Sequence, residues 1–220
     1  INAIVSSAHS LDLIGASYTL SGGTLSGPQA AEFVSGTFKQ FSGTNTIGEI
    51  SIAGTYTFAG GTLSVVSGLD GLEFVGAFGS SGGFIQRGGT HTVAQALEIG
   101  NQVNGTYVLS GGLLSMPVSG PSPNSGYGEF IGENNGAIGT FIQTGGTNIV
   151  ADRIVIGTTS LGGASDAGGT YILGGSGVLN VNTLFVGSEQ GCSGTFDFNT
   201  AKGDNLSLIH ISEPTRQAEI

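Results

Sequence analysis

A glycine-rich phrase returns eight times along this chain and constrains its fold more than any other feature. Each copy opens with a small residue, usually Gly-Thr, continues with Tyr or Phe, and passes through a Gly-Gly-type turn into a short apolar-alternating run. A self-similar phrase at intervals of a few tens of residues is the signature of a repeat array. The aromatic residue of each copy alternates between tyrosine and phenylalanine: Tyr18, Phe38, Tyr56, Phe84, Tyr107, Phe141, Tyr171 and Phe196.

A second phrase precedes each aromatic residue and consists of a short strand-like run ending in Ile or Val before a small residue. Side chains branched at Cβ pack well on a pleated surface, so we predict that this position forms an inward-facing ladder. Each unit then contains three short strands, and equivalent strands of successive units pair about 4.8 Å apart. The predicted ladder residues are Ile14, Val34, Ile52, Val75, Ile99, Ile131, Ile156 and Val186.

These patterns predict an all-β fold, a right-handed parallel β-solenoid of about eight coils over residues 1–205. Glycine at the corners supplies the positive φ that sharp bends demand, and parallel crossovers are overwhelmingly right-handed. The unequal repeat lengths place extra residues in corner loops at 77–83, 117–128 and 158–168. The alternative architecture is an antiparallel meander, because Ser-Gly-Gly between two alternating runs is also a hairpin signal.

The composition excludes several other classes of protein. Glycine supplies 42 of 220 residues, but there is no Gly-X-Y period and proline numbers only 5, which excludes collagen. Charged residues make up 9% of the chain, whereas disorder needs high charge. Five basic residues and a net charge of −10 argue against nucleic-acid binding. Cys192 is alone, so we expect no disulfide and no cysteine-based metal site within the chain.

The ends of the chain are interpreted separately from the array. It opens at Ile1 close to the first repeat, without a visible signal peptide, which indicates an internal fragment. No apolar run approaches roughly 18 residues, so we expect no direct membrane insertion of this segment. Residues 206–220, LSLIHISEPTRQAEI, lack glycine and resemble translated sequencing-adapter sequence, which implies a non-native tail. A terminal cap, with a strand over 206–211 and a helix begun at Ser212, is the alternative.

The alternation of G-T-Y-x-L-S-G-G-x-L-S with G-T-F-x-Q-x-G-G-T-N-x-V, joined by L-x-I-G segments, carries a family resemblance. Over about residues 11–200 the chain resembles the β-strand repeats of bacterial autotransporter-associated and PEP-CTERM-type surface proteins. This resemblance implies a large exported protein, extracellular and associated with the outer membrane, in which this piece belongs to the stalk. The sequence contains neither a translocator barrel nor a sorting signal, so both secretion routes stay open.

Parallel β-helices also include polysaccharide lyases and hydrolases, whose sites need carboxylates, or a carboxylate with Arg or Lys, on one face. An adjacent acid–base pair is more typical of a solvated surface ion pair, and His91 takes the position of Asn45 and Asn148 in sister units. We therefore interpret His91 as a polar turn or ladder residue and expect no catalytic, cofactor-binding or metal-binding residues. The candidate groups are Asp152 with Arg153, His91, Arg87 and Lys39.

Acidic residues share one position of the strand-like run, three residues before the small residue. Cations between stacked carboxylates would relieve their repulsion. Apolar residues interrupt the row, however, and neither the calcium-binding nonapeptide nor an EF-hand loop is present, so we expect no bound calcium. The acidic residues of the row are Asp12, Glu32, Glu73 and Glu129, and the apolar ones are Ile50, Leu97, Ile154 and Leu184.

Two rows of aromatic residues allow different interpretations. The Tyr/Phe row from Tyr18 to Phe196 is expected to pack the core or a corner, and an exposed ladder that binds sugar rings is the alternative. The second row contains Phe33, Phe74, Phe130 and Phe185, with Ser51 and Glu98 in other units, and predicts a half-covered outer face beneath the inserted loops.

These observations favour a structural or adhesive segment of an exported surface protein, without catalysis and without a cofactor. Backbone ladders would stiffen the segment, and the corner loops would carry its contacts. Its expected partners are surface glycans or neighbouring copies of itself through unpaired strand edges. The alternative function is a carbohydrate-binding or polysaccharide-cleaving β-helix.

Overall fold

The computed structural model describes residues 10–120, 126–134, 136–158, 167–187 and 191–199. Within these ranges the regular structure is entirely β-strand, and the strands pair into one continuous sheet. The strands are β1 (Leu11–Leu13), β2 (Ser17–Val34), β3 (Thr37–Ile52), β4 (Thr55–Phe58), β5 (Thr62–Val65), β6 (Leu72–Val75), β7 (Gly82–Gln86), β8 (Thr90–Val93), β9 (Ala96–Ile99), β10 (Gly105–Leu109), β11 (Leu113–Met116), β12 (Gly128–Glu133), β13 (Ile138–Gln143), β14 (Thr147–Thr158), β15 (Gly168–Gly174), β16 (Val178–Val186) and β17 (Ser193–Asn199).

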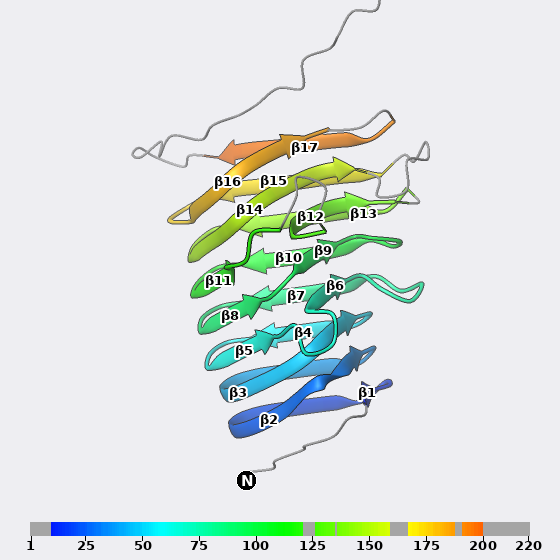
Figure 1. Cartoon of the computed structure of the whole chain (residues 1–220), viewed down its shortest axis with the longest axis vertical. Helices are drawn as coiled ribbons and strands as arrows, with labels where there is room; N and C mark the ends of the chain where they lie inside the picture. Colours follow the sequence, from blue (N-terminus) through cyan, green and yellow to red (C-terminus); the bar gives the residue numbers. More distant parts are fainter. Residues whose placement is uncertain (1–9, 121–125, 135, 159–166, 188–190, 200–220) are drawn as a thin grey trace, which may run out of the picture.

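The chain winds as a parallel β-solenoid, in which each strand pairs with its equivalent in the preceding and following coils (Figure 1). Every pairing between these named strands is parallel. The antiparallel meander is therefore excluded for the described chain. Some coils run through their corners without a break, so that β2 and β3 each span three of the predicted short strands.

The Tyr/Phe row forms a column through the core, as the repeat predicts. Tyr56 pairs in register with Phe38 below it and with Phe84 above it. The ring centroids of Phe38 and Tyr56 lie 4.5 Å apart with 9° between the ring planes, and those of Tyr107 and Phe141 lie 4.9 Å apart with 4° between them. All rings from Phe38 to Tyr171 are buried. The column therefore packs the interior, and the exposed sugar-binding ladder is excluded for these rings.

The ladder of β-branched residues is confirmed from Val34 onward, but its first member was predicted wrongly. Leu13, not Ile14, pairs with Val34, and the Ile14 side chain is 74% exposed. The reason is the alternation of β1, which turns Leu11 and Leu13 inward and Asp12 outward. Aligning Ile14 with the ladder would bury the carboxylate of Asp12, so Ile14 becomes an additional corner residue.

Glycine has two different roles in each coil. The second glycine of the Gly-Gly corner has a positive φ, as at Gly112 with φ 83°. The glycine before Thr-Tyr or Thr-Phe has ordinary φ but lies against the backbone of the coil below. A Cβ atom on Gly105 would overlap the carbonyl oxygen of Val75. The first role was predicted from the sequence, and the second adds a constraint on how closely successive coils approach.

As far as the coil of Tyr171, three further inward rows alternate between apolar and polar residues with a period of two coils. The polar members belong to the Phe-type coils, so the structural unit is a pair of coils. The row two residues after the aromatic residue contains Leu20, Gln40, Phe58, Gln86, Leu109, Gln143 and Leu173. The row after the Gly-Gly corner contains Leu25, Asn45, Leu63, His91, Leu114, Asn148 and Leu179. The third row contains Leu11, Glu32, Ile50, Glu73, Leu97, Glu129, Ile154 and Leu184.

The corner loops lie on the outside of this core. A tight turn in the loop 77–83 is closed by reciprocal backbone bonds between Ala77 and Ser80, of 3.1 and 3.0 Å. This turn places Phe78 edge-on to Phe33, with ring centroids 4.9 Å apart. Of the other two predicted loops, residues 121–125 and 159–166 lie outside the described residues, as does the predicted tail 206–220.

Candidate functional site

The described core contains three equivalent polar networks, and they are its main concentration of chemically active side chains. Each network combines a glutamate, a glutamine and an asparagine or histidine of one Phe-type coil with the tyrosine of the next coil. All of these side chains are buried to 0% exposure. The first network is Glu32, Gln40, Asn45 and Tyr56; the second is Glu73, Gln86, His91 and Tyr107; the third is Glu129, Gln143, Asn148 and Tyr171.

In the first network the Asn45 amide joins a carboxyl group to a phenol. Its Nδ2 donates to Glu32 Oε2 at 2.8 Å and to the Tyr56 hydroxyl at 3.3 Å. The Tyr56 hydroxyl donates to Gln40 Oε1 at 3.0 Å, and Gln40 Nε2 donates to the Thr62 carbonyl oxygen at 2.9 Å. This last bond fixes the orientation of the glutamine amide, since only its nitrogen can donate to a carbonyl. The direction of every other bond in the network follows from it.

The third network repeats this geometry. Asn148 Nδ2 donates to Glu129 Oε2 at 2.8 Å and to the Tyr171 hydroxyl at 3.2 Å. Tyr171 in turn donates to Gln143 Oε1 at 2.6 Å, and Gln143 Nε2 donates to the Val178 carbonyl oxygen at 3.0 Å. The same arrangement in separate coils indicates that the network is a property of the repeat.

The second network replaces the asparagine with His91, and the hydrogen bonds determine where its protons lie. Gln86 Nε2 donates to the Leu113 carbonyl oxygen at 2.9 Å, so Gln86 Oε1 must accept from the Tyr107 hydroxyl, 2.6 Å away. Tyr107 has no second proton to give. His91 Nδ1, 3.0 Å from that hydroxyl, is therefore the donor of their hydrogen bond. On the other side of the ring, His91 Nε2 lies 2.8 Å from Glu73 Oε2, and a hydrogen bond between these two atoms needs a proton on one of them.

Burial dominates the electrostatics of the networks. It raises the pKa of Glu32 to about 7, against the opposing hydrogen bond from Asn45, and a smaller contribution comes from the charge of Glu73. Burial likewise raises the pKa of Glu129 to about 8, against the hydrogen bond from Asn148. Because solvent does not reach these groups, a soluble substrate cannot contact them, and their role is within the structure.

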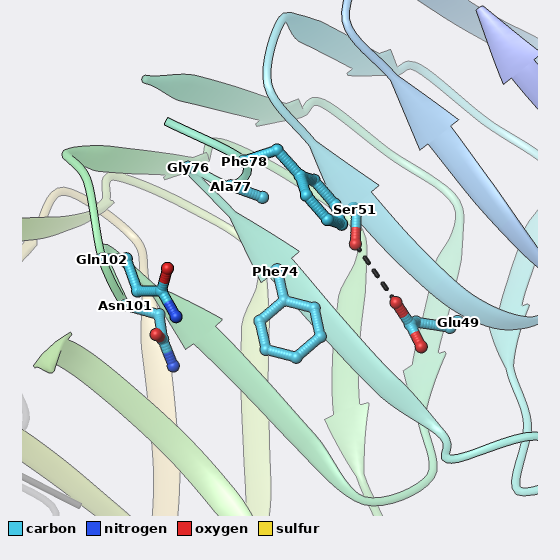
Figure 2. A pocket seen from close by; sticks show the side chains of 8 residues that line it. All are labelled: Glu49, Ser51, Phe74, Gly76, Ala77, Phe78, Asn101 and Gln102. Atoms are coloured by element: carbon cyan, nitrogen blue, oxygen red, sulfur yellow. Dashed lines mark hydrogen bonds between the residues drawn. The ribbon is translucent and has the colours of Figure 1, made fainter. Parts of the chain in front are cut away.

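On the outer face, a cleft of about 230 Å³ lies over the strands β3, β6 and the turn that follows each of β6 and β9. Figure 2 shows the Phe74 ring between the amides of Asn101 and Gln102 on one side and the carboxyl group of Glu49 on the other. Ser51 Oγ donates to Glu49 Oε1 at 3.3 Å. Phe78, 72% exposed and at φ 52°, lies at one wall. An apolar ring bordered by amides and a carboxyl group is suited to a ligand with both apolar and hydroxyl surfaces.

The outer row that contains Phe74 was predicted to be half-covered, and the structure confirms this. Phe74 pairs in register with Ser51 and Glu98, and each is at most partly exposed. Burial raises the pKa of Glu98 to about 7, with a further contribution from the charge of Glu133. Asn101 donates to Glu98 Oε2 and, at 3.4 Å, to Glu133 Oε2. Sequence reasoning missed this carboxyl pair, because Glu133 ends its strand β12 at a position with no equivalent acid in the sister coils.

The candidate catalytic groups lie in different environments in the structure. Lys39 and Arg87 are exposed, whereas His91 is sealed in the core, which confirms its interpretation as a ladder residue. Asp152 accepts a hydrogen bond of 2.9 Å from the Gly120 backbone nitrogen and so fastens the start of the loop 117–128. The Arg153 guanidinium lies 5.7 Å from the centre of the Phe130 ring.

The row of acidic residues differs from the prediction at Asp12 and in the buried partners of its glutamates. Asp12 does not belong to it, because the register of β1 pairs Asp12 with Phe33 and Leu11 with Glu32. Glu32, Glu73 and Glu129 do share the row, but in alternate coils and facing the interior. Sequence reasoning missed their partners. No group of three His, Cys, Asp or Glu side chains suited to a metal ion occurs among the described residues.

Comparison of the chain with protein-family models, with curated proteins and with solved structures finds no match. Within the described part of the chain, no helix has the length and apolar character needed to span a membrane.

Proposed function

We propose that this chain is a structural and adhesive segment of an exported bacterial surface protein, a stalk that resembles an autotransporter passenger, and that it catalyses no reaction. In this proposal the solenoid is right-handed, residues 1–205 belong to one array, and residues 206–220 are a non-native tail. The segment lies outside the cell, associated with the outer membrane. It contacts surface glycans or neighbouring copies of itself, and it needs no cofactor.

The observation that carries the proposal is the unbroken aromatic column. Six successive rings from Phe38 to Tyr171 are fully buried and in register. Parallel ladders run beside them along the whole described length, so each coil is held by both neighbours. A structure of this kind transmits force along its axis and sets a distance. The polar side chains of the networks are fully buried and hydrogen-bond to one another, which supports a structural role for the core.

The experiment removes one pair of coils and measures the distance that the segment spans. Deletion of residues 56–106 joins Thr55 to Tyr107, two positions that are equivalent to Thr106 and Tyr56 in the repeat. The chain and this variant are displayed on cells between a membrane anchor and a terminal epitope. Epitope height and the maximum dimension from small-angle scattering should both fall by about 10 Å, two strand spacings. An unchanged height would contradict the stalk function.

A second candidate function, binding of carbohydrate, is favoured by the outer cleft around Phe74. Sugar rings stack on aromatic faces, and their hydroxyl groups bond to amides and carboxylates such as those of Asn101, Gln102 and Glu49. Binding of the chain to a panel of immobilised polysaccharides tests this function. F74A should abolish binding, and F185A, in the same outer row but outside the cleft, should retain it. Equal binding by both variants would exclude the cleft. Cleavage of a bound polysaccharide that is lost in E98Q would instead indicate an enzyme.

A further inference from the structure

The first and third networks each leave two buried oxygen atoms without a hydrogen-bond partner among the described residues. These are Oε1 of the glutamate and Oδ1 of the asparagine: Glu32 with Asn45, and Glu129 with Asn148. In both pairs the neighbouring atoms are already bonded, Nδ2 of the asparagine to Oε2 of the glutamate at 2.8 Å. A buried acceptor oxygen without a donor is unfavourable, and a buried carboxylate with a single hydrogen bond is strongly disfavoured.

One added proton gives both the glutamate Oε1 and the asparagine Oδ1 a hydrogen-bond partner. A carboxylic acid protonated at Oε1 becomes a donor, and the free acceptor on the same partner is the amide Oδ1. The acid and the amide then form two parallel hydrogen bonds, one in each direction, and no polar atom of the pair stays unpaired. An ionised carboxylate cannot make the second bond, since it has only acceptors.

In the second network the buried carboxyl group faces a histidine, which can share a proton with it. His91 already donates through Nδ1, so its contact with Glu73 through Nε2 holds one proton between two otherwise unpartnered atoms. With one proton in this contact the pair is neutral overall, whichever atom carries the proton. Asparagine has no proton to share in this way, so neutrality in the other networks requires the carboxyl group itself to be protonated.

Within the part of the chain that the structure describes, no basic side chain contributes to the pKa shifts of the carboxyl groups in the first and third networks. The charged and titratable groups that face Glu32 are Glu73 and Tyr56. Those that face Glu129 are Tyr171 and Tyr107, whose pKa values burial raises well above the usual range. Glutamate and tyrosine side chains are neutral when protonated and negative when ionised. None of these groups therefore supplies the positive charge that would stabilise a carboxylate.

We propose that Glu32 and Glu129 are held in the core as neutral carboxylic acids, each donating a proton from Oε1 to Oδ1 of its asparagine, and that the solenoid is a pH-sensitive structure that loses stability as the pH rises. The sensitive element recurs at a spacing fixed by the coil pair. Longer arrays of the same repeat would carry more of these acids, and their alkaline response would increase with length.

The direction of the pH effect follows from linkage. Both carboxyl groups have a higher pKa in the folded chain than the ordinary value of 4.5. The folded state therefore retains protons that the unfolded state releases. The stabilisation is complete below about pH 4.5 and is lost as the pH rises through about 7 for Glu32 and about 8 for Glu129.

The test compares urea unfolding of the wild type, E32Q/E129Q and D12N from pH 5 to pH 9. Glutamine reproduces the two-bond ring without a titrating proton, and Asp12 is an exposed acid on β1 that serves as the control. Over this range the unfolding constant of the wild type and of D12N should rise at least about a thousandfold more than that of E32Q/E129Q. Equal pH dependence in all three proteins would overturn the proposal.

Infrared spectroscopy of the wild type gives a second measurement that does not require the variant to fold. A protonated carboxyl group has a C=O stretch above the amide band, and a carboxylate does not. This band should be present at pH 6 in protein that has exchanged into heavy water and should disappear as the pH rises through 8. Its absence from the folded protein at pH 6 would overturn the proposal, whatever the variant does.

Discussion

The Nε2 atom of His91 lies 2.8 Å from Oε2 of Glu73, and neither side chain is accessible to solvent. The pair sits between the coils of Tyr56 and Tyr107, and the ring of His91 stacks on Phe84 with centroids 5.0 Å apart. In the coils directly below and above, the positions of His91 are taken by Leu63 and Leu114. The repeat thus accepts either a matched polar pair or a matched apolar pair.

This matching predicts a strongly coupled response to substitution at Glu73 and His91. H91L alone leaves a buried carboxyl group unpaired and should lower the free energy of unfolding by about 3–5 kcal/mol. E73L alone should cost a similar amount, because it leaves the imidazole without its partner. E73L/H91L installs the side chains found in neighbouring coils and should recover most of the loss, since apolar replacements of buried ion pairs are often neutral. Urea unfolding at pH 6 measures all three, and additive losses would contradict the matching.

The tyrosine hydroxyl groups supply a second prediction. Y107F removes the acceptor of His91 Nδ1 and the donor to Gln86 Oε1, and leaves both atoms buried. We expect the free energy of unfolding to fall by about 1–3 kcal/mol. Y18F is the matched control, because Tyr18 occupies the same row but is half-exposed at the end of the column. Its effect should stay within about 0.5 kcal/mol. Thermal and urea unfolding measure the loss of stability in Y107F and Y18F. Similar losses for both variants would contradict a role of the Tyr107 hydroxyl in the network.

The rows could be predicted from the sequence because each is a position counted from an aromatic residue or a small residue. That counting located the Tyr/Phe column, the ladder from Val34 onward and the shared position of His91, Asn45 and Asn148. The prediction is wrong at Ile14, because the final β-branched residue of that run lies outside the ladder. The alternation of Leu11, Asp12 and Leu13 was the better guide, since a buried strand edge excludes an unpaired aspartate.

The polar networks could not be predicted in the same way, although a signal for them was present. The apolar residues Ile50 and Leu97, which alternate with Glu32 and Glu73, indicate that the acid row faces the interior. Its partners are 13 to 19 residues further along the chain, and sequence separation alone does not show which inward rows face each other across a coil. The cleft at Phe74 depends on the φ of Phe78, which no repeat position encodes.

The glycine before the Thr-aromatic pair, such as Gly105, should not tolerate substitution. Gly83, which takes the place of the threonine in its own coil, should tolerate it. In G105A the new Cβ would overlap the Val75 carbonyl oxygen, and the coils would have to separate locally. We expect a loss of more than about 3 kcal/mol, in the range of severe overpacking. Gly83 has open space at the Cβ position and pairs with Thr106 in the next coil. G83A should therefore be neutral or stabilise by up to about 1 kcal/mol. Equal losses in thermal unfolding would show that coil contact does not set the glycine requirement.

The two-coil period predicts that removing two coils destabilises the protein less than removing one, because only the two-coil deletion preserves the alternation of the rows. Deletion of residues 56–106 removes Glu73, Gln86 and His91 and places Tyr107 above Gln40 and Asn45, so that the first network regains a tyrosine hydroxyl. Deletion of residues 56–83 removes a single coil and joins Thr55 to Phe84. That ring has no hydroxyl group.

In the single-coil variant, Gln40 and Asn45 would then lose a buried partner, and His91 would face Ile50 in place of Glu73. Each unpaired buried group costs about 1–3 kcal/mol. The shorter deletion should therefore be the more destabilising one, even though it retains more of the chain. Circular dichroism and urea unfolding of the two variants measure this directly. A single-coil variant as stable as the two-coil variant would show that the alternation of tyrosine and phenylalanine has no energetic role in the core.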